Sequence, residues 1–222
     1  KQFGKAIIEF PAVYDMLFIM KAKLDAGRSL LYQTSRYVDI YKALDDIARE
    51  RKLTPEERQE QKRYAKLADA FTPLAKGMNS EYCNQNTYDC IQIHGGSGFM
   101  MEYACQRIYR DARITSIYEG TTQLQTVAAI RYVTNGAYSQ ILQEYGMYPV
   151  SAEMQPLQDR IKSMVCKFDA CTNAVKEAAN QELLDFVARR LYEMAAVCIM
   201  SHLIIQDATN APEMFSKSAL VY

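Results

Sequence analysis

The chain has 222 residues, of which 49% are hydrophobic, and its 26 basic and 26 acidic side chains cancel to no formal net charge. This apolar content is enough for a sizeable core in one domain or two. Because both signs of charge are interspersed, nucleic acid and anionic membranes are not expected as main partners. No uncharged apolar run can span a bilayer and no signal peptide is present, so we predict a cytoplasmic protein without a membrane span.

The predicted elements are helical almost throughout the chain. Apolar residues recur with helical spacing from Ile7 to about Arg49, which predicts a first long helix. Thr54-Pro55-Glu56-Glu57 predicts the start of a second helix, with an N-cap, a proline at the first helical position and a capping-box glutamate. Pro73 is expected to kink or interrupt this helix, and a third helix is expected over residues 80–93.

Two further helices are predicted before the one break in composition. A short basic piece ends at Arg113, and a helix starts after Thr121 and reaches about Tyr145. The four longer helices predict an all-α, four-helix up-and-down bundle. A linker over residues 146–151 then divides the chain into a bundle, 1–146, and additional C-terminal helices in an extension, 147–222. Within the extension, helices are expected over residues 157–179 and 183–205, followed by a short one from Ala211.

The six cysteines include no CxxC pair, and lone thiols on apolar helix faces are typical of a core. Only two histidines, His94 and His202, could join them as ligands. We therefore predict no metal site and a reducing compartment. The cysteines concerned are Cys83, Cys90, Cys105, Cys166, Cys171 and Cys198.

The chain is organised around the stretch from Gln92 to Gln125. It opens with a turn, His94 to Gly98, whose three glycines allow positive φ and the close approach of another molecule. The turn lacks the Lys-Ser/Thr of a phosphate-binding loop and follows a helix, so a nucleotide fingerprint is excluded. A tight interhelical turn is the alternative interpretation.

Glu119 stands beside Gly120, just before a predicted helix whose first residues include Thr121 and Thr122. The free N–H groups and positive potential of a helix N-terminus suit a polar or anionic ligand. A carboxylate at this position can be desolvated toward a base-like pKa, or it can satisfy the helix terminus. For an isolated carboxylate, the second interpretation is favoured. The basic run Arg107, Arg110 and Arg113 is interpreted as a solvated or salt-bridged helix face.

Three ordered motifs resemble the C-terminal domain of the acyl-CoA dehydrogenases. They are Gln-x-x-Gly-Gly-x-Gly-Phe at 92–99, Arg-x-x-Arg-Asp-Ala-Arg at 107–113 and Ile-Tyr-Glu-Gly-Thr-x-Gln at 117–123. The resemblance covers about residues 1–145. The later helices resemble the C-terminal extension of some larger bacterial members.

The resemblance implies α,β-dehydrogenation of an acyl-CoA thioester by an FAD enzyme. Glu119 matches the base that removes the α-proton, and Gly120 is implied to contact the substrate. Thr121 and Gln123 match positions that hold the flavin. Positions that touch the FAD of a neighbouring subunit are matched by Phe3, Gln92, Gly95 and Gly96. The implied partners are an electron-transferring flavoprotein and further copies of the chain, in a dimer or tetramer.

The chain also departs from the family pattern. A glutamine that is common near the FAD is replaced by Pro11, and an arginine that contacts the flavin diphosphate would fall before Lys1. We expect none of these 222 residues to belong to the N-terminal helical domain or the central β-domain of the family. We therefore expect this chain, taken alone, to fold without catalysing. The alternative function is a non-catalytic helical module that oligomerises or binds a partner.

Overall fold

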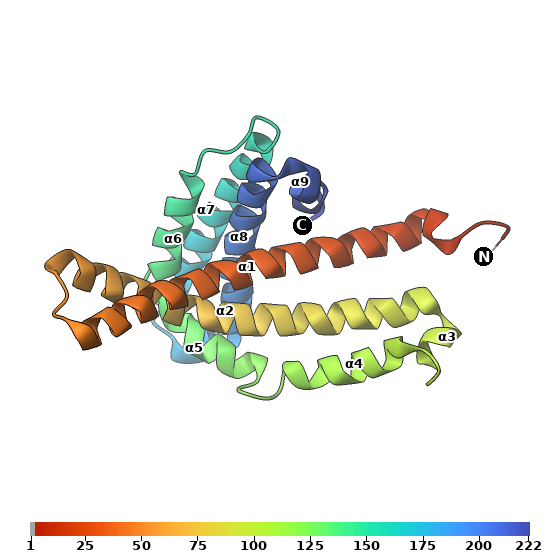
Figure 1. Ribbon diagram of the computed structural model, residues 1–222, viewed down its shortest axis with the longest axis horizontal. Helices are drawn as coiled ribbons and strands as arrows, with labels where there is room; N and C mark the ends of the chain where they lie inside the picture. The colour runs from red at the N-terminus through yellow and green to blue at the C-terminus, as the bar shows by residue number, and fades with distance from the viewer. Residues whose placement is uncertain (1–2) are drawn as a thin grey trace.

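The computed structural model describes residues 3–222, and its elements in this range are helices (Figure 1). This confirms the all-α class. A short 3-10 helix and nine α-helices follow one another as η1 (Ile7–Glu9), α1 (Pro11–Glu50), α2 (Pro55–His94), α3 (Gly96–Phe99), α4 (Ala104–Thr115), α5 (Thr122–Thr134), α6 (Ala137–Gly146), α7 (Gln155–Glu177), α8 (Gln181–Asn210) and α9 (Pro212–Val221). None of the helices in the described range is long and apolar enough to cross a membrane.

Helices α1 and α2 form an antiparallel pair that runs the length of the molecule (Figure 1). Each contains 40 residues, which corresponds to about 60 Å of helix. The predicted start of α2 is confirmed, because the backbone N–H of Glu57 donates to Thr54 Oγ1 (3.2 Å) and the N–H of Thr54 donates to Glu57 Oε2 (2.9 Å). Pro11, the departure from the family pattern, occupies the first position of α1, where its missing N–H costs nothing.

The expected interruption at Pro73 was wrong, because α2 continues through this residue to His94 and includes the helix predicted for 80–93. Two buried tyrosines stabilise the turn that contains the proline. The hydroxyl of Tyr138 donates to the carbonyl of Ala70 (2.7 Å), and the hydroxyl of Tyr192 donates to the carbonyl of Pro73 (3.1 Å). Gly77 makes room for this contact, since a Cβ there would lie 2.1 Å from the hydroxyl oxygen of Tyr192.

The helix predicted from Thr121 to about Tyr145 is divided in two. α5 ends at Thr134, and Gly136 adopts a left-handed conformation with φ +81° before α6 begins. A glycine with positive φ is the usual way to end a helix. The side chain of Asn135 then accepts a hydrogen bond from the backbone N–H of Ala137 (3.0 Å), which helps to start α6.

Helix α8 lies at the centre of the hydrophobic core. It packs against α1, α5, α6, α7 and α9, and α7, α8 and α9 confirm the three helices expected after the linker. Its fully buried side chains include Tyr192, Ile199 and Ile204, which meet Phe71 of α2 and Phe168 of α7 in one continuous cluster. The extension therefore does not sit beside a finished bundle; it supplies much of the core.

A second part of the molecule, residues 79–128, contributes no fully buried residue to this core cluster, although Tyr82 packs against its edge. We call these residues the arm: they comprise the second half of α2, then α3, α4 and the start of α5 (Figure 1). The buried residues of the arm are mostly small, and many of its large apolar side chains are exposed. The exposed ones are Tyr88, Phe99, Met100, Met101, Tyr103, Ile108, Tyr109, Ile114, Ile117, Tyr118, Leu124 and Val127.

The expectation that the cysteines belong to the core was wrong for three of them. Cys105 and Cys198 are buried and Cys90 is partly buried, whereas the side chains of Cys83, Cys166 and Cys171 are exposed. In α7 the buried stripe follows other positions, at 161, 165 and 168, so the two thiols of this helix point away from α8. The presence of a cysteine alone therefore does not predict which face of a helix is buried.

Candidate functional site

The loop between α4 and α5 holds Glu119 in an unusual backbone conformation. Glu119 has φ +54° and Gly120 has φ +94°. A left-handed conformation is ordinary for glycine but costs a side-chain-bearing residue on the order of 1–3 kcal/mol, so the surroundings must impose it. Such strain is concentrated at functional sites, which makes this loop a candidate site.

Two side chains from the neighbouring helices impose this conformation. Gln125 Nε2 donates to the carbonyl oxygens of Glu119 (3.3 Å) and Gly120 (3.2 Å), and Lys76 Nζ of α2 donates to that of Gly120 (2.5 Å). A Cβ at position 120 would approach Gln125 Nε2 to 2.8 Å, so glycine is needed there. Both contacts use carbonyl groups and leave the N–H side of the loop free.

The carboxylate of Glu119 is exposed and has no hydrogen-bond or ion-pair partner in residues 3–222. The backbone N–H of Glu119 likewise has no acceptor within this range. The cap of α5 is Thr121, whose Oγ1 accepts from the N–H of Leu124 (3.4 Å), so the interpretation of Glu119 as a structural cap is wrong. A carboxylate and an N–H group are thus both available to a bound molecule.

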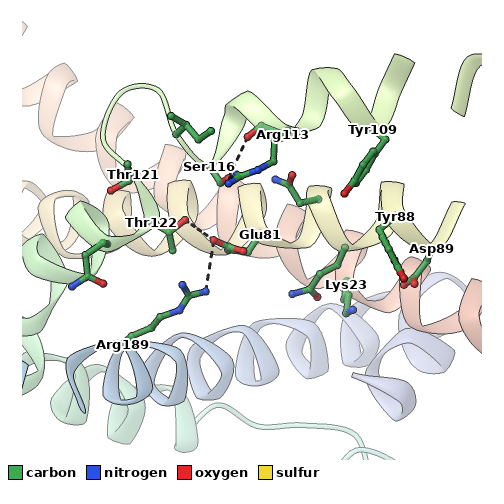
Figure 2. A pocket seen from close by; sticks show the side chains of 14 residues that line it. Lys23, Glu81, Tyr88, Asp89, Tyr109, Arg113, Ser116, Thr121, Thr122 and Arg189 are labelled. Carbon is green, nitrogen blue, oxygen red and sulfur yellow. Dashed lines mark hydrogen bonds and ion pairs between the residues drawn. The ribbon is translucent and has the colours of Figure 1, made fainter. Parts of the chain in front are cut away.

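A cleft of about 720 Å³ lies beside this loop, between α1, α2, α4, α5 and α8 (Figure 2). Thr121 and Gln123 line it, as do Ser116 and Arg113, whose Nη1 donates to Ser116 Oγ (2.5 Å). At its centre Glu81 accepts a hydrogen bond from Thr122 Oγ1 (2.6 Å), and Arg189 Nη2 lies 3.7 Å from the same carboxylate oxygen (Figure 2).

Glu81 and Arg189 connect three helices at this cleft. Glu81 belongs to α2, Arg189 to α8, and Thr122 is the first residue of α5. Arg189 also donates to Glu193 (2.9 Å), and this hydrogen bond raises the pKa of the guanidinium above its usual value. The C-terminal extension therefore helps to place the start of α5, and with it the loop of Glu119.

The other predicted cofactor residues lie far from Glu119. Lys76 touches the loop, and Gly95 follows 19 residues later, about 28 Å farther along α2 and the turn that ends it. Gly96 follows Gly95, and the N–H of Gly95 donates to the carbonyl of Gln92 (3.1 Å). A Cβ at either glycine would meet no atom within 4 Å. Phe3 is 88% exposed, and the N-terminal segment lies toward the same end of the molecule as α3 (Figure 1).

The structure thus brings Glu119, Gly120, Thr121 and Gln123 together and separates them from the glycine turn. The residues that the resemblance assigns to two different flavins lie at opposite ends of the arm.

Sequence reasoning missed four residues that shape the site: Lys76, Glu81, Gln125 and Arg189. Three of them lie at least 38 positions from Glu119 in the chain, and charged or amide residues on helices carry no local signal of such a role. Gln125 belongs to the stretch from Gln92 to Gln125, but its hydrogen bonds to the loop can be recognised only in the folded structure, where the loop folds back over α5.

Two family models cover the whole chain. The model for "Acyl-CoA dehydrogenase, C-terminal domain" matches residues 1–133, and the model for "Acyl-CoA dehydrogenase C terminal" matches residues 134–222. The chain belongs to the acyl-CoA dehydrogenase family. The two models meet at the end of α5, and the division predicted after residue 146 stays a prediction.

The acyl-CoA dehydrogenase chain resembles several curated proteins. It is 36% identical over 125 residues to "Caffeyl-CoA reductase-Etf complex subunit CarC" of Acetobacterium woodii, covering 56% of this chain and 27% of that protein. It is 29% identical over 217 residues to a butyryl-CoA dehydrogenase of Syntrophomonas wolfei, covering 92% of this chain and 33% of that protein. The chain therefore spans about a third or less of the length of these relatives.

Solved structures of the family share the fold. An acyl-CoA dehydrogenase of Bacillus anthracis complexed with FAD matches with a TM-score of 0.70 at 24% identity, covering all of this chain and 40% of that one. ACDH-11 of Caenorhabditis elegans in complex with C11-CoA matches with a TM-score of 0.76 at 18% identity, covering 100% and 36%. The matches include α6 to α9, so the added helices also belong to an arrangement seen before.

Proposed function

We propose that this chain is the C-terminal part of an FAD-dependent acyl-CoA dehydrogenase, in which Glu119 is the base for α,β-dehydrogenation of an acyl-CoA thioester. The observation that carries the proposal is the free carboxylate and free N–H of Glu119 on a backbone locked by Gln125 and Lys76. A base must be held rigidly and still be reachable by substrate, and this loop meets both conditions.

The chemistry explains why a carboxylate and an N–H group belong together. An α-proton is too weakly acidic for a carboxylate unless the thioester carbonyl is polarised. The N–H of Glu119 can donate to the carbonyl oxygen and stabilise the charge that develops there. The carboxylate of the same residue then takes the α-proton, and Gly120 lets the thioester approach the backbone closely. Thr121 and Gln123 would hold the FAD, which would supply the acceptor for the β-hydrogen as hydride.

The residues of this chain fit such a cofactor in two places. Thr121 and Gln123 present a hydroxyl and an amide at the N-terminus of α5, on the cleft beside Glu119. The open space over Gly95 and Gly96 lets a planar or phosphorylated group approach bare backbone, next to Gln92. Together with Phe3, these residues are proposed to touch the FAD of a neighbouring subunit.

This assignment requires a homo-oligomer, dimer or tetramer, because the two groups of residues are about 28 Å apart. The exposed apolar side chains of the arm supply a surface of the kind that such contacts bury. Sedimentation of the full-length protein checks this; a monomer across micromolar concentrations would contradict it.

We further propose a cytoplasmic enzyme that passes electrons to an electron-transferring flavoprotein, as the name of the Acetobacterium relative suggests for that protein.

Replacing Glu119 by Gln in the full-length protein tests the base. We expect FAD and ligand binding to persist, while the rate of flavin reduction by a panel of acyl-CoAs falls roughly 100-fold or more, the scale of lost general-base catalysis. Stopped-flow absorbance of the flavin under anaerobic conditions measures this rate. Glu60→Gln, an exposed glutamate of α2, is the matched control and should leave it unchanged. A Glu119→Gln protein that reduces its flavin at the normal rate would place the base elsewhere.

The second candidate function is a non-catalytic helical module that oligomerises or binds a partner. The unusual extent of exposed apolar surface on the arm favours it. The absorption spectrum of the full-length protein separates the two candidates, because only the enzyme needs a stoichiometric flavin.

Taken alone, the 222-residue chain should be helical by circular dichroism, colourless, and inactive toward acyl-CoA with an artificial acceptor. Its core is buried, but Tyr118 and Leu124 beside Glu119 are half exposed, so a flavin would keep much of its ring in water. A yellow chain with bound FAD would show that the arm holds the cofactor without the other domains.

A further inference from the structure

The corner where α2 turns into α4 brings together three side chains that are far apart in the chain or were interpreted separately. Cys90 and His94 lie one turn apart near the end of α2, and Cys105 lies in the first turn of α4. One ligand atom from each of them lies within 4.8 Å of the others. In residues 3–222 this is the only such group of three histidine, cysteine or acidic side chains.

We infer that Cys90, His94 and Cys105 form a binding site for Zn²⁺, with three protein ligands and a fourth position open to water. Two thiolates and an imidazole are a ligand set that Zn²⁺ prefers, and no carboxylate belongs to the group, which disfavours Mg²⁺ and Ca²⁺. Three protein ligands plus water is the arrangement of open zinc sites.

The distances agree with tetrahedral coordination. Zn–S bonds of about 2.3 Å and Zn–N bonds of about 2.1 Å place neighbouring ligand atoms roughly 3.5–3.8 Å apart in a tetrahedron. Cys90 Sγ and His94 Nδ1 are already 3.8 Å apart. The third ligand needs to approach by no more than about 1 Å, which small side-chain rotations provide.

The fold positions these ligands through the glycine turn. Gly98 packs directly on the end of α2, since a Cβ there would lie 2.9 Å from His94 Cβ and 2.8 Å from the carbonyl oxygen of Ile91. The N–H of Gly98 donates to the carbonyl of Gly95 (2.9 Å) and closes the turn that returns the chain toward Cys105. Because the corner is held by backbone packing, the site does not require the metal in order to form.

Binding of Zn²⁺ would replace an existing hydrogen bond of His94. His94 Nδ1 now lies 2.8 Å from the carbonyl oxygen of Cys90, to which it donates in the Nδ1–H tautomer. On binding, the proton moves to Nε2 of this exposed ring, Nδ1 coordinates the ion, and the two thiols release their protons to solvent. His94 is exposed and Cys90 is only partly buried, so an ion can enter from the surface.

The prediction that no metal site exists relied on the absence of a CxxC pair. Cys90 and Cys105 are 15 positions apart, and only the turn at residues 95–103 brings them together. The site lies at the other end of α4 from Glu119, beside the glycine turn that is proposed to touch the FAD of a neighbouring subunit.

Cobalt titration of the full-length protein tests the inference. The protein is reduced, freed of metal with a chelator and titrated anaerobically with Co²⁺, whose tetrahedral thiolate complexes absorb strongly in the visible range. We expect one equivalent to bind with such a spectrum and Zn²⁺ to displace it. Cys90→Ser, His94→Asn and Cys105→Ser should each weaken binding at least 10-fold. Cys166→Ser, at an exposed thiol outside the group, should leave it unchanged.

Circular dichroism verifies that each variant folds, and Cys90→Ser, at a partly buried position, keeps the test valid if Cys105→Ser does not fold. Absence of stoichiometric binding in the reduced protein would overturn the inference, as would an unchanged spectrum in a folded Cys90→Ser variant. A disulfide between Cys90 and Cys105 that forms on purification in the presence of excess Zn²⁺ would also overturn it, because the pair would then be a redox site.

Discussion

The core around α8 and the arm use the same secondary structure in opposite ways. In the core, large side chains such as Phe168 and Ile199 are completely buried, and the polar groups that enter it include hydrogen-bonded tyrosines such as Tyr138. In the arm, Phe99 and Met101 are 79% and 86% exposed, and no residue belongs to the core cluster. Stability and chemistry are therefore located in different parts of one chain, with the proposed catalytic residues in the part that does least for folding.

This division has a physical cause. A helix buries a stripe of apolar residues against a partner. The arm has apolar residues on more than one face, whereas its α4 packs mainly on α2. The uncovered surface is then available to a substrate, a cofactor or another subunit. The core, by contrast, has enough helices to cover both sides of α8.

The largest expected difference in stability is between two Phe→Ala substitutions, one in the core and one in the arm. Phe168→Ala removes a fully buried ring and should lower the free energy of unfolding by about 3–5 kcal/mol, because a cavity remains. Phe99→Ala, in the arm, should change it by no more than about 0.5 kcal/mol. Urea denaturation followed by circular dichroism measures both. Equal losses at the two positions would show that the arm contributes to the same cooperative unit as the core.

The second prediction concerns the loss of stability at low pH, which we again expect to originate in the core. His202 of α8 is fully buried, neither ring nitrogen has a hydrogen-bond partner, and its ring meets that of Tyr145 edge-on at 6.3 Å. Burial, together with the charge of Lys162, lowers its pKa to about 4 from 6.5. The unfolded chain therefore binds more protons between these values, so this contribution to stability is complete above pH 6.5 and is lost as the pH falls toward 4.

Below pH 4 the loss is on the order of 3 kcal/mol, because each tenfold change in proton affinity corresponds to about 1.4 kcal/mol. Urea denaturation at pH 7, 5.5 and 4.5 should show this slope in the wild type and a shallower one in His202→Leu. The matched control is Met200→Leu, at a fully buried position of the same helix that carries no titratable group, which should keep the wild-type slope. Parallel curves for wild type and His202→Leu would assign acid sensitivity to other groups.

The smallest effect is expected where the two regions are joined. Arg189→Gln removes the contact of α8 with Glu81, a pair that is partly exposed, and should cost less than about 1 kcal/mol. The informative measurement is the double variant with Glu81→Gln. Its loss of unfolding free energy should be smaller than the sum of the two single losses, because each single change already removes the shared interaction. Arg190→Gln, whose guanidinium lies over Phe186 on the same helix, is the control and should add normally.

Much of the fold could be predicted because its signals are local. Helical periodicity, the capping box at Thr54 and the prolines at the first helical positions of α1, α2 and α9 determine most helix starts. The predicted interruption at Pro73 was wrong. Local chemistry disfavours a proline inside a helix, and here tyrosines from α6 and α8 hydrogen-bond to carbonyls of the turn that contains it. The division at Gly136 was missed, although a glycine in a helical pattern is a recognised end signal.

The site follows the same rule. Glu119 and Thr121 were found through a contiguous motif, whereas Lys76 and Arg189 act across long distances in the chain and were not. The thiols of Cys90 and Cys105 were interpreted separately because fifteen residues and a turn lie between them. Local patterns identify the candidate site residue, and the tertiary structure identifies which residues hold it.

The uninterrupted course of α2 limits how the length of this chain can vary. Lys76 touches the loop of Glu119 and Gly95 opens the distant turn, so one continuous helix sets the spacing between the two places where a flavin is proposed to bind. Inserting a single residue between them would lengthen the spacing by about 1.5 Å and rotate one end by about 100° relative to the other. Between these two points, an insertion or deletion keeps both ends on the same side of the helix only if it is close to two whole turns, about seven residues. The loop before Thr54 has no such restriction.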